Sequence, residues 1–466
     1  MRATAGWALA VVLAGCGGTL EQDGMPLHEE SLGTIRQAEA PDGPVAWVRF
    51  ARGEGLQLGS AVTQDRDGNV LTTVLFSGGA DLGTGPLGLD DPEVPGVVLA
   101  KHAADGRLLW TRVLQGRRGG LLSVNALGTD RERNVLLAGW SEAGAELDSS
   151  GGTAPVRVEG AFLMKLDHSG RTLWTKRLAG HGALLANGLV TDRAGNVFMS
   201  GSLYDGSLDF GGQVLSAVGL RAFLAKYGAD GTLKWLHAEG ESSQGGGVAL
   251  DEQGDAYFCG TAPGESSEEP STGTRTGLRR LASETGAVVW AQELEDGDCS
   301  GVAVHGNRVV MTGSFLGAFT FGGKTYRASD TPGVLDADAF LVAYTLAGEE
   351  RWARNFARAS TGVAMDQADG VLVTGHYEGG DSVGRRALPG TAGSLDNIFV
   401  AKLDRIDGTL RWVRGFPSTA ALALDVSVTR EGEGVLVGAF GGPTDFGAGR
   451  VGPEGGYDAF ILRLGK

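Results

Sequence analysis

The segment Ala222-Phe-Leu-Ala-Lys-Tyr-Gly-Ala-Asp-Gly-Thr-Leu-Lys-Trp235 decides the fold of this 466-residue chain. It contains two short apolar runs joined at Asp230-Gly231, which predicts a β-hairpin because glycine supplies the positive φ that such turns demand. Variants of this segment recur every 55 to 64 residues, each ending on a tryptophan: Trp47, Trp110, Trp174, Trp235, Trp290, Trp352 and Trp412. A period of this length without helical patterning predicts one supersecondary unit stacked on copies of itself, as in a β-propeller.

Each copy of the repeat is predicted to hold four strands, which we call a, b, c and d in chain order. In the third copy, residues 186–192 and 196–201 form a first hairpin, and residues 222–227 and 233–236 form a second. A loop of about twenty residues separates the two hairpins, which is long for a connection between neighbouring strands. Strands a to d therefore predict one four-stranded antiparallel blade per repeat.

The two ends of the repeat region complement each other. Residues 45–50 carry the first tryptophan but have no strand a, b or c before them, while residues 458–464 form a strand c with no strand d after it. Pairing these two ends would complete one blade and remove the open sheet edge. The sequence thus predicts an all-β, seven-bladed propeller over residues 44–466, closed by its N-terminal Trp strand.

At this point the repeats resemble the bacterial seven-bladed β-propeller repeat family (SBBP-type). The matching segments are residues 161–174, residues 247–260 and Asp209-Phe-Gly-Gly212, and the resemblance spans about residues 44–466. A weaker likeness, in residues 281–290, is to the quinoprotein-type Trp repeat. The family resemblance implies the propeller fold and a capacity for binding, and it implies no particular activity.

The N-terminus carries an export signal. Residues 1–15 hold one charge, Arg2, and a short apolar run that is too short to span a bilayer. Leu13-Ala-Gly-Cys16 resembles the lipobox of bacterial lipoproteins, which implies cleavage before Cys16 and lipidation of that residue. Gly17 in place of an inner-membrane retention Asp favours the outer membrane, on its periplasmic or surface side. Residues 16–43 are mostly acidic or small and predict a flexible tether.

The charge balance limits the partners. The formal net charge is −16, and removal of Arg2 with the signal would make it −17. Such a surface repels nucleic acid and anionic lipid head groups, so we expect no nucleic-acid partner and membrane contact only through the lipid on Cys16.

Two cysteines remain once Cys16 is committed to lipid. Cys259 is predicted to lie at the end of a strand b and Cys299 at the start of the next strand a, so the predicted strand order places both on one rim in adjacent blades. A disulfide between them is geometrically feasible there, and free thiols stay an open alternative.

A recurring carboxylate ends strand a just before the a–b turn: Asp65, Asp130, Asp192, Asp251 and Asp366. The favoured interpretation is that these groups accept hydrogen bonds from turn amides. The alternative is a ring of carboxylates at a channel mouth that holds a cation, although His305 and Arg430 interrupt it. A basic residue, for example Lys101, recurs at an aligned position of strand c. We expect the aliphatic part of its side chain to pack on apolar neighbours and its ammonium group to lie in solvent.

Aromatic residues follow strand b in several copies and are candidate ligand contacts: Trp140, Tyr204, Phe315, Tyr377 and Phe440. They could pack beneath the long b–c loops, which recurrence favours, or form a stacking surface for sugar rings. Trp140 is the preferred single contact because it lies outside the Trp series and has polar neighbours.

No catalytic or metal-binding pattern stands out. Gly380-Asp-Ser382-Val-Gly384 matches a nucleophile elbow by chance, and the seven histidines lack metal-ligand spacing. We therefore expect no enzyme, no cofactor and no metal. The leading hypothesis is a binding scaffold for an envelope protein or polysaccharide. The alternatives are an envelope assembly factor and, less favoured, a propeller enzyme such as a lyase or quinoprotein-like oxidoreductase.

Overall fold

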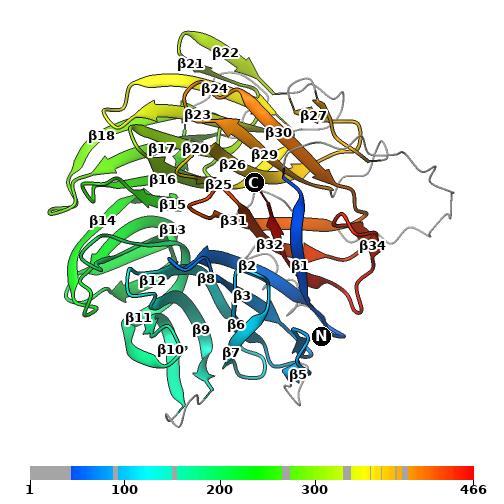
Figure 1. Ribbon diagram of the computed structural model, residues 1–466. Helices are drawn as coiled ribbons and strands as arrows, with labels where there is room; N and C mark the ends of the chain where they lie inside the picture. The colour runs from blue at the N-terminus through cyan, green and yellow to red at the C-terminus, as the bar shows by residue number, and fades with distance from the viewer. Residues whose placement is uncertain are drawn as a thin grey trace.

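The fold consists of strands arranged around a common centre, as the computed structural model in Figure 1 shows. The structure describes residues 43–87, 93–148, 155–264, 273–328, 337–356, 358–368, 370–383, 386–390 and 397–465. Every regular element in these ranges is a β-strand, and none of them contains a helix long and apolar enough to cross a membrane. The predicted all-β, propeller-like architecture is confirmed.

Four-stranded antiparallel units follow one another along the chain. The first contains β2 (Gln57–Gln64), β3 (Val70–Phe76), β6 (Gly96–His102) and β7 (Leu108–Gln115). The second contains β8 (Leu122–Thr129), β9 (Val135–Leu147), β10 (Val156–Leu166) and the first part of β11 (Thr172–Thr191). The third contains the rest of β11, β12 (Val197–Asp209), β13 (Val214–Tyr227) and β14 (Leu233–Glu241). Long hairpins join these three units into one sheet, because β9 also pairs with β7 and β12 pairs with both parts of β11.

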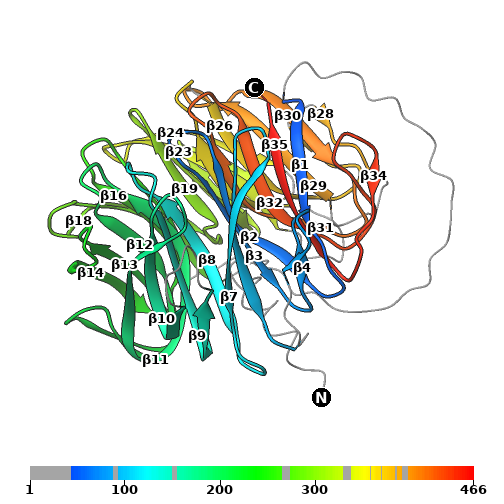
Figure 2. The ribbon, with the colours of Figure 1, turned by 60° about the horizontal axis from the view of Figure 1, so that its bottom comes forward.

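The remaining units are separate four-stranded sheets. They comprise β15 (Gln244–Leu250), β16 (Ala256–Pro263), β17 (Thr274–Leu281) and β18 (Val288–Glu295); β19 (Gly301–His305), β20 (Arg308–Phe315), β23 (Asp338–Thr345) and β24 (Glu350–Phe356); and β25 (Ala359–Met365), β26 (Gly370–Tyr377), β29 (Asn397–Asp404) and β30 (Leu410–Phe416). The last contains β31 (Ala421–Val428), β32 (Gly434–Phe440), β35 (Asp458–Leu464) and β1 (Val45–Ala51). In this last unit Val48 of β1 lies opposite Leu462 of β35, so strands from the two ends of the chain pair side by side (Figure 2).

Small hairpins lie within the connections between the second and third strands of several units. These are β4 (Ala80–Asp81) with β5 (Pro86–Leu87), β21 (Ala318–Phe321) with β22 (Lys324–Arg327), β27 (Ser382–Val383) with β28 (Arg386–Ala387), and β33 (Thr444–Asp445) with β34 (Arg450–Val451). They make these connections longer and less uniform than the tight turns at the other end of each unit.

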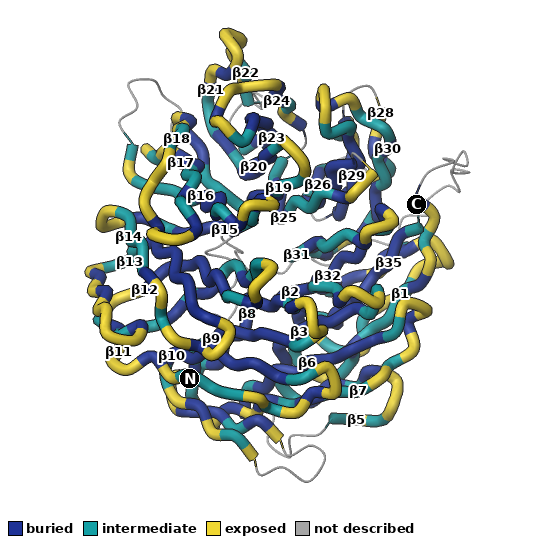
Figure 3. The backbone as a smooth tube through the Cα atoms, turned by 60° about the vertical axis from the view of Figure 1, so that its left-hand side comes forward, coloured by how far each residue is buried: buried dark blue, intermediate teal, exposed yellow. Residues whose placement is uncertain are grey.

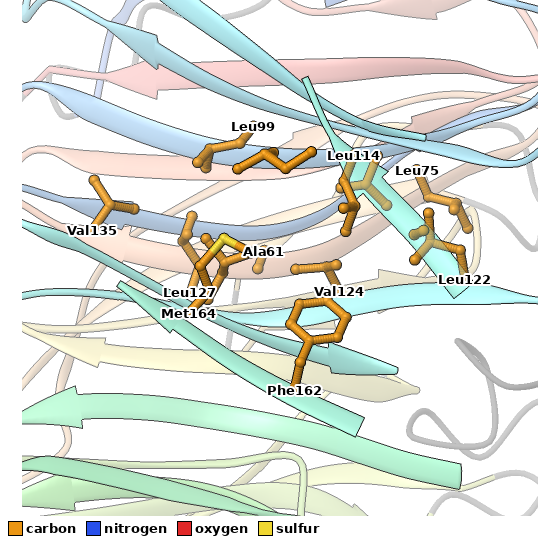
Figure 4. Close-up of a cluster of buried hydrophobic side chains, with 14 of the residues drawn as sticks. Ala61, Leu75, Leu99, Leu114, Leu122, Val124, Leu127, Val135, Phe162 and Met164 are labelled. Carbon is orange, nitrogen blue, oxygen red and sulfur yellow. The ribbon is translucent and has the colours of Figure 1, made fainter. Parts of the chain in front are cut away.

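The hydrophobic core lies between neighbouring units. Figure 4 shows one part of it, where Leu122 and Val124 of β8 meet Phe162 of β10 and Ala61 of β2. Burial decreases outward, so the outer strands and the turns carry most of the exposed positions (Figure 3). Apolar side chains on both faces of a strand are expected when each sheet is covered by a neighbour on either side.

The repeated tryptophans join each unit to the next. Nε1 of Trp47 donates to the carbonyl of Ala104 at 3.0 Å, in the c–d turn of the following unit, and Gly106 of that turn lies on the indole ring. A Cβ on Gly106 would lie 2.9 Å from the ring, and the backbone there has a φ of +83°, so both contact and conformation require glycine. Equivalent indole bonds to the next unit are made by Trp110, Trp174, Trp235, Trp290 and Trp352.

Candidate functional site

The units have two different ends, which we call the turn face and the loop face. The turn face consists of the tight turns within the hairpins, such as residues 65–69 and 103–107. The loop face consists of the b–c connections and the links between units, such as residues 116–121. The site residues predicted from the sequence occur on both faces.

The strand-ending carboxylates belong to the turn face, where each is held by its own turn. Oδ1 of Asp65 accepts hydrogen bonds from the amides of Asp67 and Asn69, both at 3.0 Å, and Oδ2 lies 2.8 Å from Nζ of Lys101. Burial opposes ionisation of Asp65, yet the hydrogen bonds from Asn69 and Lys101 and the charge of Lys101 outweigh it and lower its pKa. Matching ion pairs join Asp130 to Lys165, Asp192 to Lys226 and Asp366 to Lys402.

The lysine heads are therefore not in solvent, and that expectation is wrong. Side chains of the four paired lysines are only 4 to 10% exposed, because each ammonium reaches a buried carboxylate across its sheet. Where Leu281 stands in place of lysine, Arg280 bonds Asp255 at 2.8 Å and lies 3.7 Å from Asp251. These internal partners satisfy the predicted carboxylates.

The last unit also has a turn-position side chain that accepts a turn amide and a strand-c cation that is paired, but with different residues. Thr429 occupies the turn position, and its hydroxyl accepts the amide of Glu433, while Arg463 pairs with Glu433 at 2.5 Å. The interruption of the carboxylate series is thus Thr429. Arg430, which the sequence suggested, is the exposed residue that follows it.

A polar cavity of about 120 Å³ opens among the innermost strands toward the loop face. Its wall includes one residue at the same repeat position of every unit, five residues before the a–b turn position. Six of these residues lie in the inner strands and Ser300 directly precedes β19. They are Ser60, Asn125, Asn187, Gly246, Ser300, Thr361 and Leu424. The register shifts around Ser60, Asn125, Asn187, Thr361 and Leu424, so these are β-bulge residues. A β-bulge changes the direction in which a side chain points, and here it allows these bulge residues to line the cavity.

The residue that follows each of these seven wall positions is small in every case but one. It is Ala or Gly in six strands: Ala61, Ala126, Gly188, Gly247, Gly301 and Gly362. A Cβ on Gly247 would already lie 3.1 Å from the amide nitrogen of Val302 in the next inner strand. At the seventh position stands Asp425, which also lines the cavity. Sequence reasoning missed this residue, although its departure from the small residues of the repeat was a visible signal.

The two cysteines form a disulfide beside this cavity, and Cys299 is part of its wall. Cys259 of β16 is bonded to Cys299, which precedes β19, with their Cα atoms 6.1 Å apart. Gly246 lies beside the bond, and a Cβ there would come within 2.9 Å of Sγ of Cys259. The disulfide joins two adjacent units at the loop face, where the strand order had placed both cysteines.

The candidate aromatics divide by burial. Phe315, Tyr377 and Phe440 are at most 1% exposed and pack beneath the loops, Phe315 against Phe319 and Phe440 against Phe446. In this conformation they offer no surface to a ligand. Trp140 is half-buried, and Tyr204 is 47% exposed. Only these two of the predicted aromatics are available at the surface.

Cys16, the predicted lipid site, lies outside the described residues, as do the signal and nearly all of the tether. Within the described ranges no group of three or more His, Cys, Asp or Glu side chains is placed to hold a metal ion. Gly384 of the elbow-like pattern also falls outside those ranges, so that pattern acquires no geometry here.

Comparisons with known proteins give distant likenesses. No protein-family model matches the chain, and no curated protein matches it either. Among solved structures, the Pan2 WD40 domain of Neurospora crassa is 10% identical, with 88% of this chain and 89% of that chain covered at a TM-score of 0.43. BamB from Moraxella catarrhalis is 13% identical, with 90% and 98% covered at 0.38. A Synechocystis apocarotenoid oxygenase mutant is 12% identical, with 91% and 94% covered at 0.42. None of these values carries a function over to this chain.

Proposed function

We propose that this protein is a lipid-anchored binding module of the cell envelope, built as a closed, seven-bladed β-propeller whose loop face binds an envelope protein or a polysaccharide. The lipid on Cys16 would hold it at the outer membrane. An envelope assembly role is a special case of the same activity, in which the bound partner is a folding or inserting protein.

Closure is supported by contacts that run around the whole set of inner strands. β2 contacts β8, β8 contacts β11, and the series continues through β15, β19 and β25 to β31, which contacts β2 again. Gly43 supports the same conclusion, because it lies on the ring of Trp412 with a φ of +77°, as the turn glycines lie on the other tryptophans. In addition, the amide of Gly465 donates to the carbonyl of Pro44 at 2.6 Å, so the two ends of the chain replace a missing c–d turn.

Binding through the loop face is supported by the exposed apolar side chains of one hairpin. On the turn face, the recurring charged pairs of Asp and Lys are internally satisfied, so they have a structural task. On the loop face, the β12–β13 hairpin exposes Tyr204, Val214 and Val218, at 47%, 65% and 84%. Large apolar side chains gathered on one extended hairpin favour contact with a partner.

Retention of envelope components tests the binding proposal. The full chain carrying Cys16→Ser is used as bait against detergent-solubilised envelope, alongside Tyr204→Ala and Val218→Ser variants on the loop face. A matched control is Arg131→Ala, an exposed residue of the turn face. We expect a stoichiometric protein or glycan that the loop-face variants lose and the control keeps. Equal retention by all variants would contradict loop-face binding.

The anchor has a separate test. Metabolic labelling with a fatty acid should mark the wild-type protein and leave Cys16→Ser unlabelled in the soluble fraction. If Cys16→Ser stays in the membrane fraction at the wild-type level, lipidation at Cys16 is not what holds the protein there.

A further inference from the structure

Asp425 stands where the repeat allows only a small residue. Its six counterparts have at most one side-chain carbon, because the neighbouring inner strand passes close to that position. Asp425 adapts to the same closeness by bonding to that neighbour: its Oδ2 accepts the amide of Val62 in β2 at 2.8 Å. The carboxylate therefore lies at the junction of β31 and β2, facing the cavity.

The negative charge of Asp425 has no cationic partner in the described part of the chain. Its remaining bond is from the amide of Val426 to Oδ1, at 2.8 Å. Among the described residues, the cavity wall otherwise consists of hydroxyl, amide, backbone and apolar groups and the bridged Cys299, so Asp425 is the one ionisable side chain among them. Burial raises the pKa of Asp425 to about 7, against the opposing effect of its two amide hydrogen bonds. A carboxylate in such surroundings gains stability from a positive charge brought close to it.

The other wall residues offer neutral oxygens to such a charge. The amide of Asn125 makes no hydrogen bond within the described residues, and Nδ2 of Asn187 donates to the carbonyl of Gly245, which leaves its Oδ1 free of a described donor. Ser300 and Thr361 add hydroxyls. A cavity of about 120 Å³ has room for several water molecules. The donor set is oxygen throughout, which suits a hydrated hard cation or a primary ammonium group.

We propose that the cavity at the loop face is a cation-binding site in which Asp425 supplies the charge and Asn125 and Asn187 supply neutral oxygens. The cation is either a free hydrated ion or the ammonium group of a lysine side chain from a bound partner. In the second case the site would be the charged anchor of the proposed loop-face interaction, and the inference then rests on that proposed function.

Calcium chloride and methylammonium chloride are the two probes, titrated separately at constant ionic strength and pH 8 while the melting temperature and heat of binding are recorded. The full chain carrying Cys16→Ser should show a saturable response to at least one probe. Asp425→Asn should weaken that response at least tenfold. The matched control Asp205→Asn removes an exposed loop-face carboxylate at a positive φ that Asn tolerates, and it should respond like the parent.

The two probes separate the sources of the charge. A response to calcium alone identifies a hydrated metal ion, and a response to methylammonium identifies an ammonium group of the kind a partner lysine carries. No saturable response to either probe, or an equal response in Asp425→Asn, would overturn the proposal. If Asp425→Asn does not fold, Asn125→Val decides, since it removes a neutral oxygen and should weaken binding several-fold. These titrations contain no envelope partner, so their failure is distinguishable from failure of the bait experiment.

Discussion

Asp65 directly follows β2 and Asp425 lies in the neighbouring inner strand β31, yet the two carboxylates lie at different faces of the molecule. Asp65 belongs to the turn face and has an asparagine, two turn amides and a lysine as partners, which together lower its pKa. Asp425 belongs to the cavity at the loop face and has two backbone amides only, so burial dominates and its pKa rises. Asp65, which recurs in the repeat, is neutralised by Lys101 inside the protein. Asp425 departs from the repeat and has no cationic partner among the described residues, so its charge is available to a ligand.

Breaking the Asp65–Lys101 ion pair should have the strongest effect on the free energy of unfolding. Lys101→Met leaves Asp65 as a buried charge without its cation, because the Asp65 side chain is 0% exposed. We expect a loss of about 3–5 kcal/mol in the free energy of unfolding, measured by urea denaturation. The double variant with Asp65→Asn should recover part of that loss. A loss below about 1 kcal/mol in the single variant would show that the pair is dispensable.

Removing the disulfide tests how far the loop face depends on covalent support. Cys259 and Cys299 are separated by 40 residues, and opening a loop of that size is expected to cost about 2–4 kcal/mol. Cys259→Ala with Cys299→Ala, compared with the parent under non-reducing conditions, measures it. Addition of a reductant should bring the parent to the stability of the double variant, and no change would mean that the bond adds nothing.

The pH dependence of stability should distinguish the two carboxylates by sign. The pKa of Asp425 is about 7 in the folded protein, above its ordinary value of 3.8, so between about pH 4 and 7 the folded state holds more protons than the unfolded state. Stability from this group is thus present at low pH and lost as the pH rises toward 7. Asp65, with a lowered pKa, acts in the opposite direction and loses its contribution in acid.

Comparison of parent and Asp425→Asn isolates this effect. Urea unfolding at pH 4, 5.5 and 7 should show the parent losing stability relative to the variant as the pH rises. A constant difference between them across that range would contradict the raised pKa.

Breaking an exposed ion pair on the turn face should have the smallest effect on the free energy of unfolding. Arg133 lies 2.6 Å from Asp67, with side chains 44% and 54% exposed. Solvent screens such a pair, so Arg133→Ala should leave the free energy of unfolding almost unchanged. A larger change would mean that recurrence and burial are not what distinguish the Lys101 pair.

The repeat itself was readable in the sequence, and the site was not. Seven tryptophans with a glycine-containing turn define the unit, because hairpin periodicity and turn chemistry are local properties of the chain. The Asp–Lys pairing was missed because it joins strands far apart in sequence. A signal existed, since His305 and Ala343 replace both partners in the same unit. The bulge positions could not be derived, because a bulge leaves the residue pattern of a strand almost unchanged.

The pairing of β1 with β35 has a consequence for how the protein is made. β1 leaves the ribosome long before its partner strand exists, so its edge must stay unpaired until β35 has been synthesised. Unpaired strand edges invite association with other chains during that interval. A circular permutant that begins at β31 and joins residue 465 to residue 43 would make β31, β32, β35 and β1 consecutive. It should therefore refold faster and with less aggregation than the natural order of strands.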